Sequence, residues 1–191
     1  MLIGRYSAFL DANVLHPAFL RGALLWFADE RLFRPVWSAH VLAEWRSSVE
    51  RRRKDLEPAA LDRMQAAAVQ AFPDAEVAGY DALIDGLSLP DPDDRHVLAA
   101  AIVGRCHGII TANLKDFPEE EVARFSMEVI HPDAFIVNII DLEENRALAA
   151  CKRHRAAMSK SLPTADDYLD QFERSGLIQA HQRLIGRKDL L

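Results

Sequence analysis

The chain is poor in cysteine, has no long apolar run and carries no excess of basic residues. Cys106 and Cys151 are its only cysteines, and two thiols so far apart in sequence provide neither a disulfide framework nor the ligand spacing of a zinc site. We therefore expect a cytoplasmic protein in a reducing compartment. No apolar run approaches the roughly 18 residues that a membrane helix needs, so we expect no membrane-spanning segment.

The N-terminus lacks a basic segment followed by an apolar stretch and a small-residue cleavage site, so we expect no signal peptide. Hydrophobic residues make up 50% of the 191 residues. This share is sufficient for a sizeable core and argues against a disordered chain. A chain of this length fits one domain with a small appendage.

The formal net charge of −6 is unlike that of most nucleic-acid-binding proteins, which are basic. The charges are unevenly distributed, however. Basic residues are concentrated at 51–54 ("RRRK") and 152–155 ("KRHR"), and acidic residues at 91–94 ("DPDD") and 119–121 ("EEE"). The sequence therefore allows a local basic track beside an acidic pocket.

Short apolar segments alternate with segments of helical periodicity as far as residue 131. The predicted strands are 6–10, 32–38, 75–78, 108–111 and 127–132. The predicted helices are 16–31, 39–54, 57–72, 80–87, 94–105 and 119–125, with Ser38 as an N-cap and Pro58 in a first turn. This alternation predicts an α/β fold with a mostly parallel sheet. In such sheets, ligands bind beyond the carboxyl ends of the strands.

After about Pro132 the pattern becomes purely helical. We predict helices at 132–142, 142–160 and 164–175, with Asp133 as a candidate cap of the first. Thr164 is the predicted N-cap of the last, with Asp167 three residues later and Gly176 as its stop signal. The chain is therefore divided into a domain at 1–131 and a helical C-terminal extension at 132–191.

Acidic residues occupy the boundaries of the predicted elements. They follow strands, as in "AFLDANVL" and "GIITANLKD", or lie in early helical turns, as in "HVLAEWR" and "DPDDRHV". Each of them alone has an ordinary explanation as a cap, a loop residue or a helix N-terminal charge. Taken together, at junctions of this kind, they favour a functional site. These residues are Asp11, Glu44, Asp91, Asp93, Asp94 and Asp116.

Glu44 follows Val41 by three residues, so it lies near the buried face of its helix, where an unpaired carboxylate is unfavourable. Several carboxylates in one crevice repel one another and raise one another's pKa values. A divalent cation removes that repulsion, and oxygen ligands favour Mg²⁺ or Mn²⁺ over zinc. Such a cation activates a bound water and neutralises charge on a phosphate. The chemistry that matches is phosphodiester hydrolysis.

Four segments, "FLDANVL", "WSAHVLAEWR", "LPDPDDRHVLAAAI" and "GIITANLKDFP", closely resemble the PIN-domain ribonucleases, and among these the VapC-type toxins of bacterial type II toxin–antitoxin pairs. The resemblance covers roughly residues 6–131, with the motifs in the family's order and spacing. It implies a Rossmann-like α/β/α sandwich, a PIN-like nuclease domain at 1–131 and an endoribonuclease that depends on Mg²⁺ or Mn²⁺. It also implies structured RNA, often transfer RNA, as substrate, a cognate antitoxin that occupies the active-site groove, and a homodimer.

The resemblance assigns Asp11, Glu44 and Asp94 as the catalytic metal ligands, with Asp91 and Asp93 as close competitors of Asp94. These two competitors are otherwise expected to orient ligands or water.

The family's fourth acidic position is Asn113 in this chain. A neutral amide is a weaker cation ligand, which leaves one metal or two as open alternatives. Asp116 is the candidate metal ligand that restores the missing charge, and a bridging water is the alternative. Asn13, Thr111 and Asn113 are expected to orient ligands or water. His96 is expected to have a structural role, either exposed or hydrogen-bonded.

RNA must approach an acidic crevice, so basic residues near it would supply the attraction. The candidates lie on the Glu44 helix and at its end; the alternative is that they only form a solvated helix terminus. These residues are Arg46, Arg51, Arg52, Arg53 and Lys54.

Two other classes of function remain open. A phosphatase of the haloacid-dehalogenase type would use Asp11 as a covalent nucleophile, but that family has Asp-x-Asp where this chain has Asn13. The other alternative is a non-catalytic PIN-like module that binds RNA or protein, and the neutral Asn113 is its best support.

Overall fold

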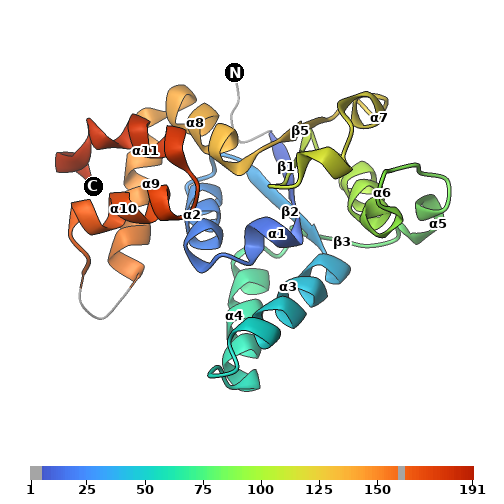
Figure 1. Cartoon of the computed structure of the whole chain (residues 1–191), viewed down its shortest axis with the longest axis horizontal. Helices are drawn as coiled ribbons and strands as arrows, with labels where there is room; N and C mark the ends of the chain where they lie inside the picture. Colours follow the sequence, from blue (N-terminus) through green and yellow to red (C-terminus); the bar gives the residue numbers. More distant parts are fainter. Residues whose placement is uncertain (1–5, 159–161) are drawn as a thin grey trace.

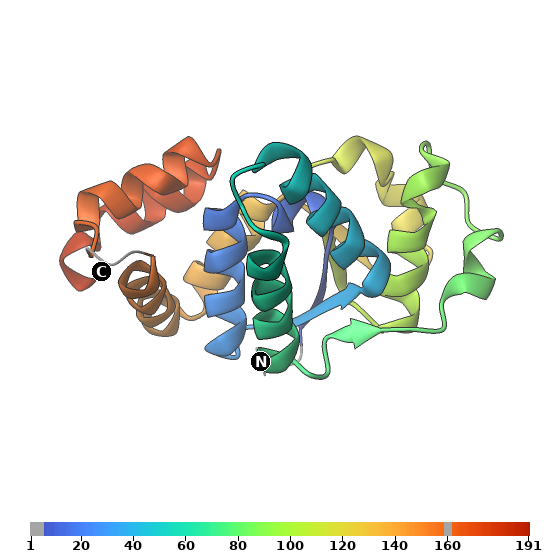
Figure 2. The ribbon, with the colours of Figure 1, turned by 90° about the horizontal axis from the view of Figure 1, so that it is seen from below.

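The computed structural model describes residues 6–158 and 162–191. Within these residues a parallel sheet of five strands has the order β3-β2-β1-β4-β5. Helices cover both of its faces, α2 on one and α6 on the other (Figures 1 and 2). The strands are β1 (Ser7–Leu10), β2 (Arg34–Ser38), β3 (Glu76–Val77), β4 (Gly108–Ile110) and β5 (Glu128–Ile130). The predicted α/β sandwich with a parallel sheet is confirmed.

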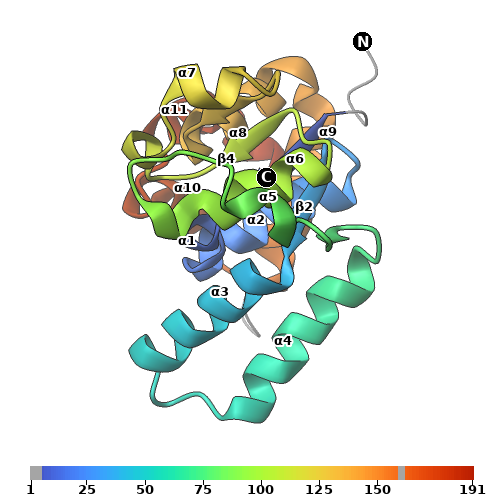
Figure 3. The ribbon, with the colours of Figure 1, turned by 90° about the vertical axis from the view of Figure 1, so that its right-hand side faces the viewer.

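The first helices of the chain connect and flank these strands. Their bounds are α1 (Ala12–Leu15), α2 (Ala18–Asp29), α3 (Ala39–Arg52), α4 (Pro58–Ala71), α5 (Asp81–Ile84), α6 (Arg95–Val103) and α7 (Glu119–Ala123). The long helices α3 and α4 lie side by side and extend away from the sheet as an arm (Figure 3). Ser38 caps α3 by accepting a hydrogen bond from the Val41 amide, and Pro58 begins α4, as predicted.

The predicted helix at 16–31 is wrong at its start. One helical turn, α1, follows Asp11 directly, and α2 begins only after Pro17. Proline has no amide hydrogen and a fixed φ, so the helical hydrogen-bond ladder is interrupted there. The helix predicted at 80–87 is also much shorter, because only the single turn of α5 forms.

The core is built around β1, which lies in the middle of the sheet. Phe9 pairs with Val36 on one side and with Ile109 on the other, and all three side chains are buried. Leu10 pairs with Ile110, so β1 and β4 end at the same level. Their next residues therefore emerge together at the carboxyl edge of the sheet.

The C-terminal part of the described chain is helical, as predicted, and packs against α2 (Figures 1 and 2). Its helices are α8 (Pro132–Leu142), α9 (Glu144–Ala157), α10 (Ala165–Arg174) and α11 (Ile178–Ile185). Thr164 and Asp167 form the predicted capping box of α10. Gly176 follows the helix with a φ of 76°, the left-handed conformation that commonly ends helices. None of the described helices has the length and apolarity that crossing a membrane requires.

Asp133 does not cap its own helix; His131 occupies that N-cap position. The buried Asp133 carboxylate instead accepts hydrogen bonds of 2.9 Å from the Gln179 and Ala180 amides at the start of α11. A side chain on α8 therefore closes the free amide end of a helix 46 residues later in the chain. Sequence spacing shows that an aspartate suits a helix start, but not which helix end approaches it.

Gly22 allows α9 to approach α2 closely. A Cβ atom at this position would lie 2.4 Å from Nε2 of the buried His154 on α9. We expect Gly22→Ala to lower the free energy of unfolding by about 1–3 kcal/mol, because the His154 ring on α9 must shift. Urea denaturation would measure this loss. Gly186→Ala is the matched control, since no atom lies within 4 Å of its added Cβ; equal losses in the two variants would contradict the packing argument.

His154 should make the stability of the fold depend on pH. Burial lowers the pKa of His154 to about 4, so the unfolded chain takes up the proton more readily than the folded one. The contribution of His154 to the free energy of unfolding is therefore constant above about pH 6.5. As the pH falls from there towards 4, the free energy of unfolding decreases by up to about 3 kcal/mol. Melting temperatures of wild type and His154→Gln between pH 4.5 and 7 would test this. The difference between them should shrink as the pH falls; a constant difference would refute it.

Candidate active site

An open pocket of about 580 Å³ lies at the carboxyl edge of the sheet. Asp11 from the end of β1, Glu44 from α3 and Asp94 from the turn before α6 all line it. Three acidic residues from separate segments thus come together in one cavity. This is the juxtaposition that their positions at element boundaries led us to expect.

Asp11 is buried, with 6% of its surface exposed. Its Oδ2 atom accepts hydrogen bonds from Thr111 Oγ1 at 2.7 Å and from Asn13 Nδ2 at 2.5 Å. Burial raises the pKa of Asp11, and the nearby charge of Glu44 raises it further, while the Thr111 hydrogen bond opposes both. The neutral donors therefore fix the side chain without neutralising its charge.

Asn13 and Thr111 also connect the loops that follow β1 and β4. Asn13 donates to Thr111 Oγ1 at 2.7 Å and accepts from the Ala112 amide at 3.0 Å. The same hydroxyl oxygen accepts from the Asn113 amide at 3.0 Å. Both residues orient Asp11 by direct hydrogen bonds, and the two loops form one connected floor for the pocket.

Asp94 is half-buried, and its pKa is raised to about 6 by burial and by the charges of Asp11, Asp91 and Asp116. Asp91 is exposed and caps the short 3-10 turn Pro92–Asp94 by accepting from the Asp93 amide at 2.9 Å. Of the three aspartates in this segment, the lining of the pocket includes Asp94. Asp91 shapes the turn that presents it, and Asp93 is exposed.

Asp116 does not line the pocket, although its charge contributes to the raised pKa of Asp94. The side-chain amide of Asn113 donates a hydrogen bond to Asp116 Oδ2. The neutral Asn113 thus holds an acidic residue beside the site.

Glu44 faces histidines rather than a basic side chain. His96 Nε2 lies 3.4 Å and His40 Nε2 lies 4.0 Å from Glu44 Oε1. Burial alone would raise the pKa of Glu44, but the hydrogen bond and charge of His96, with the charges of His40 and His16, lower it overall. Of the two structural roles expected for His96, the exposed one is wrong, because the ring is buried with its Nε2 atom facing Glu44.

Sequence reasoning missed His40 and His16 as neighbours of Glu44. His40 precedes Glu44 by four residues on α3. Residues at this spacing lie on one helix face, so the sequence alone could have indicated that His40 is a neighbour of Glu44. His16 also lines the pocket, but it reaches Glu44 only through the fold and no spacing indicated it.

The predicted basic residues separate into two groups. Arg51 lines the pocket, and the charge of Arg52, after burial, lowers the pKa of His16 there. Arg46 instead forms ion pairs with Glu50 at 3.0 Å and with Asp62 on α4.

The last two predicted basic residues lie at the tip of the α3–α4 arm. Arg53 pairs with Asp55 at 2.7 Å, and Lys54 is exposed. Neither residue lines the acidic pocket.

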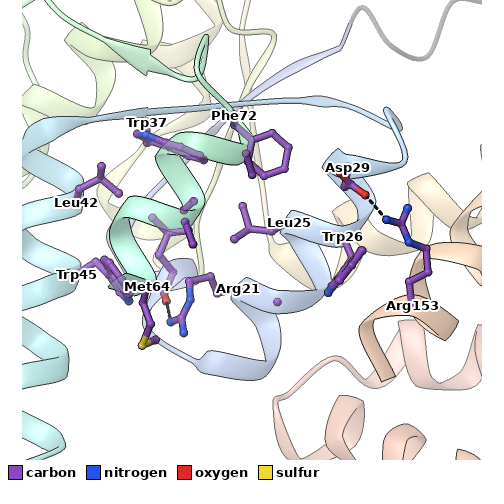
Figure 4. A pocket seen from close by; sticks show the side chains of 15 residues that line it. Arg21, Leu25, Trp26, Asp29, Trp37, Leu42, Trp45, Met64, Phe72 and Arg153 are labelled. Atoms are coloured by element: carbon purple, nitrogen blue, oxygen red, sulfur yellow. Dashed lines mark hydrogen bonds and ion pairs between the residues drawn. The ribbon is translucent and has the colours of Figure 1, made fainter. Parts of the chain in front are cut away.

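A second cavity, of about 330 Å³, lies between α2, α3 and α4 (Figure 4). Its walls are mainly apolar and include the buried rings of Trp37 and Trp45, and the guanidinium of Arg21 lies 5.0 Å from the Trp45 ring centre. The acidic side chain in its lining, Asp29, pairs with Arg153 at 2.8 Å. This cavity therefore lacks the unpaired carboxylates that distinguish the first.

The acidic pocket fits a divalent cation. Among the described residues, no lysine or arginine forms an ion pair with Asp11, Glu44 or Asp94, and the raised pKa values of the two aspartates reflect burial and mutual repulsion. A cation bound by these oxygens would relieve that repulsion. Hard cations such as Mg²⁺ and Mn²⁺ suit carboxylate ligands.

Comparisons with known proteins agree with this arrangement. A family model described as "PIN domain" matches residues 7–115, and one described as "VapC50 C-terminal domain" matches residues 132–185. A protein named "Putative ribonuclease VapC50" from Mycobacterium tuberculosis (strain ATCC 25618 / H37Rv) is 39% identical over 71 residues. That alignment covers 37% of this chain and 41% of the relative. No solved structure matches. Because the first model spans more than half of the sequence, this chain belongs to the PIN domain family.

Proposed function

We propose that this protein is a metal-dependent endoribonuclease, the toxin of a type II toxin–antitoxin system, which hydrolyses phosphodiester bonds in structured RNA. The observation that carries this proposal is the convergence of Asp11, Glu44 and Asp94 on one open pocket. The ribonuclease name of the M. tuberculosis relative and the match of residues 132–185 to a VapC50 C-terminal domain support it.

Asp11, Glu44 and Asp94 would hold Mg²⁺ or Mn²⁺, with Asp116 adding negative charge nearby. When bound, the ion supplies positive charge for a phosphate and lowers the pKa of a water molecule. The chain itself fixes the orientation of Asp11 through Asn13. Burial and neighbouring acids raise the pKa of Asp94 to about 6, which is still low enough for the carboxylate to be charged at neutral pH.

RNA would approach along the basic side of α3. Arg51 at the pocket and Arg52 beside His16 are the strongest candidates for phosphate contacts. Arg46 is engaged with acidic residues of the arm, and Arg53 with Asp55; Lys54 at the tip would act at longer range. A transfer RNA target, a cognate antitoxin over the pocket, a homodimer and a cytoplasmic location complete the proposal.

The test is cleavage of total RNA by the purified protein. We expect cutting with Mn²⁺ or Mg²⁺, none with excess EDTA, and recovery when the cation is restored. Glu44→Gln should be inactive. Asp85→Asn is the matched control, because it changes an exposed acid at the end of α5 that does not line the pocket. Cutting that persists in EDTA would overturn the metal dependence. Cutting that persists in Glu44→Gln would overturn the site.

A further inference from the structure

Imidazole rings from two separate elements gather at Glu44. His40 lies one helical turn before Glu44 on α3, and His96 lies in the first turn of α6. Their Nε2 atoms lie 4.0 Å and 3.4 Å from Glu44 Oε1. One ligand atom from each of the three residues falls within 4.8 Å of the others. These donors are therefore close enough together to share one ion.

An ordinary ion pair does not account for both rings. His40 and His96 are stacked with ring centres 3.8 Å apart and an angle of 21° between the planes. Two imidazolium charges at this separation would repel each other, whereas two neutral imidazoles can both offer a nitrogen lone pair to a metal ion.

The polar contact of the buried His96 ring is with Glu44. His96 is 4% exposed, and its Nδ1 atom has no hydrogen-bond partner among the described residues. The ring therefore interacts through the Nε2 atom that faces Glu44. His40 is exposed over about half of its side chain, so it is free to turn towards an ion between the three groups.

We propose that His40, Glu44 and His96 form a binding site for a transition cation such as Zn²⁺. His40 and Glu44 also line the acidic pocket, so this site adjoins the pocket. Its ligand set shares Glu44, but not Asp11 or Asp94, with the set proposed for Mg²⁺. Two imidazole nitrogens and one carboxylate oxygen favour Zn²⁺ over Mg²⁺, which prefers oxygen ligands. Zinc is commonly four-coordinate, and three protein ligands leave the fourth position to water.

The shared glutamate gives the site a consequence for cleavage, and this part rests on the proposed function. An ion held by His40 and His96 withdraws Glu44 from a cation bound with Asp11 and Asp94. Zn²⁺ is therefore an inhibitor of Mg²⁺-supported cleavage.

Binding is tested on metal-free full-length protein. Zn²⁺ is titrated against a chromophoric chelator, and Co²⁺ is added as a probe whose visible absorption reports nitrogen ligation. We expect one Zn²⁺ per chain and at least a tenfold loss of affinity in His40→Ala and in His96→Gln. His181→Ala, on α11, is the control and keeps the wild-type affinity.

Asp11→Asn separates the two sites, because Asp11 is not a ligand of the proposed ion. Zn²⁺ affinity that survives Asp11→Asn and falls in His40→Ala supports the inference. Wild-type affinity in His40→Ala, or a loss in Asp11→Asn as large as in His40→Ala, overturns it. Because His40 is exposed, we expect His40→Ala to fold like wild type, so the test holds even if His96→Gln is unstable.

Cleavage then distinguishes this inference from the proposed function. Each protein is compared with its own zinc-free, Mg²⁺-supported rate, and Zn²⁺ should inhibit wild type at least tenfold more strongly than His40→Ala. An absence of RNA cleavage in every cation would defeat the proposed function while leaving the binding result to stand. Cleavage without Zn²⁺ binding would defeat the inference alone.

Discussion

Asp11→Asn should reduce RNA cleavage by roughly 10³-fold, which corresponds to about 4 kcal/mol of transition-state stabilisation. The variant keeps an oxygen that can accept from Thr111 and Asn13, so the floor of the pocket is preserved. It removes a buried negative charge from a cluster whose members raise one another's pKa values. Activity should therefore fall while the metal-free fold stays at least as stable as wild type.

Initial rates on a defined structured RNA, together with thermal melting in EDTA, would check both parts of this prediction. Asp85→Asn provides the comparison for removal of an exposed charge. Full activity in Asp11→Asn would favour the non-catalytic RNA- or protein-binding alternative. Trapping of a phosphorylated Asp11 in wild type would favour the phosphatase.

Asp133→Ala should lower the free energy of unfolding by about 3 kcal/mol. The substitution leaves two amides at the start of α11, those of Gln179 and Ala180, without their carboxylate partner. Unsatisfied buried donors are unfavourable by about 1–3 kcal/mol each, and the carboxylate also interacts favourably with the positive end of the helix dipole. Chemical denaturation followed by circular dichroism would measure the loss.

Asp141→Ala is the matched control, because Asp141 connects the same two helices. It forms an exposed ion pair of 3.1 Å with Arg183 on α11. Exposed pairs contribute little, so we expect a change within about 0.5 kcal/mol. Similar losses in the free energy of unfolding for Asp133→Ala and Asp141→Ala would show that the hydrogen bonds from Asp133 do not specifically stabilise the packing of α11.

Local patterns were sufficient to predict the strands, the parallel sheet and the N-caps at Ser38 and Thr164. These features depend on side-chain alternation and on hydrogen bonds within a few residues. The meeting of Asp11 with Thr111 followed from a general property of parallel sheets, whose carboxyl ends share one edge. The role of Asp133 and the burial of His96 beside Glu44 depend on contacts between distant helices, and no local pattern specifies these.

The basic run on α3 illustrates the same limit. Composition marked Arg46, Arg51, Arg52, Arg53 and Lys54 as one group, whereas the structure gives them different partners. Which arginine is available to a ligand depends on the acidic residues that lie near it in the α3–α4 arm. A residue such as Asp62 becomes a neighbour of Arg46 only when the two helices pack.

The close packing of α9 on α2 has a consequence for synthesis of the chain on the ribosome. Gly22 and Phe19 emerge early, whereas their partner His154 is added about 130 residues afterwards. The nascent chain therefore exposes an apolar helix surface throughout most of translation, and contacts so distant in sequence form slowly. Slower elongation should lengthen that period of exposure and increase the need for chaperones.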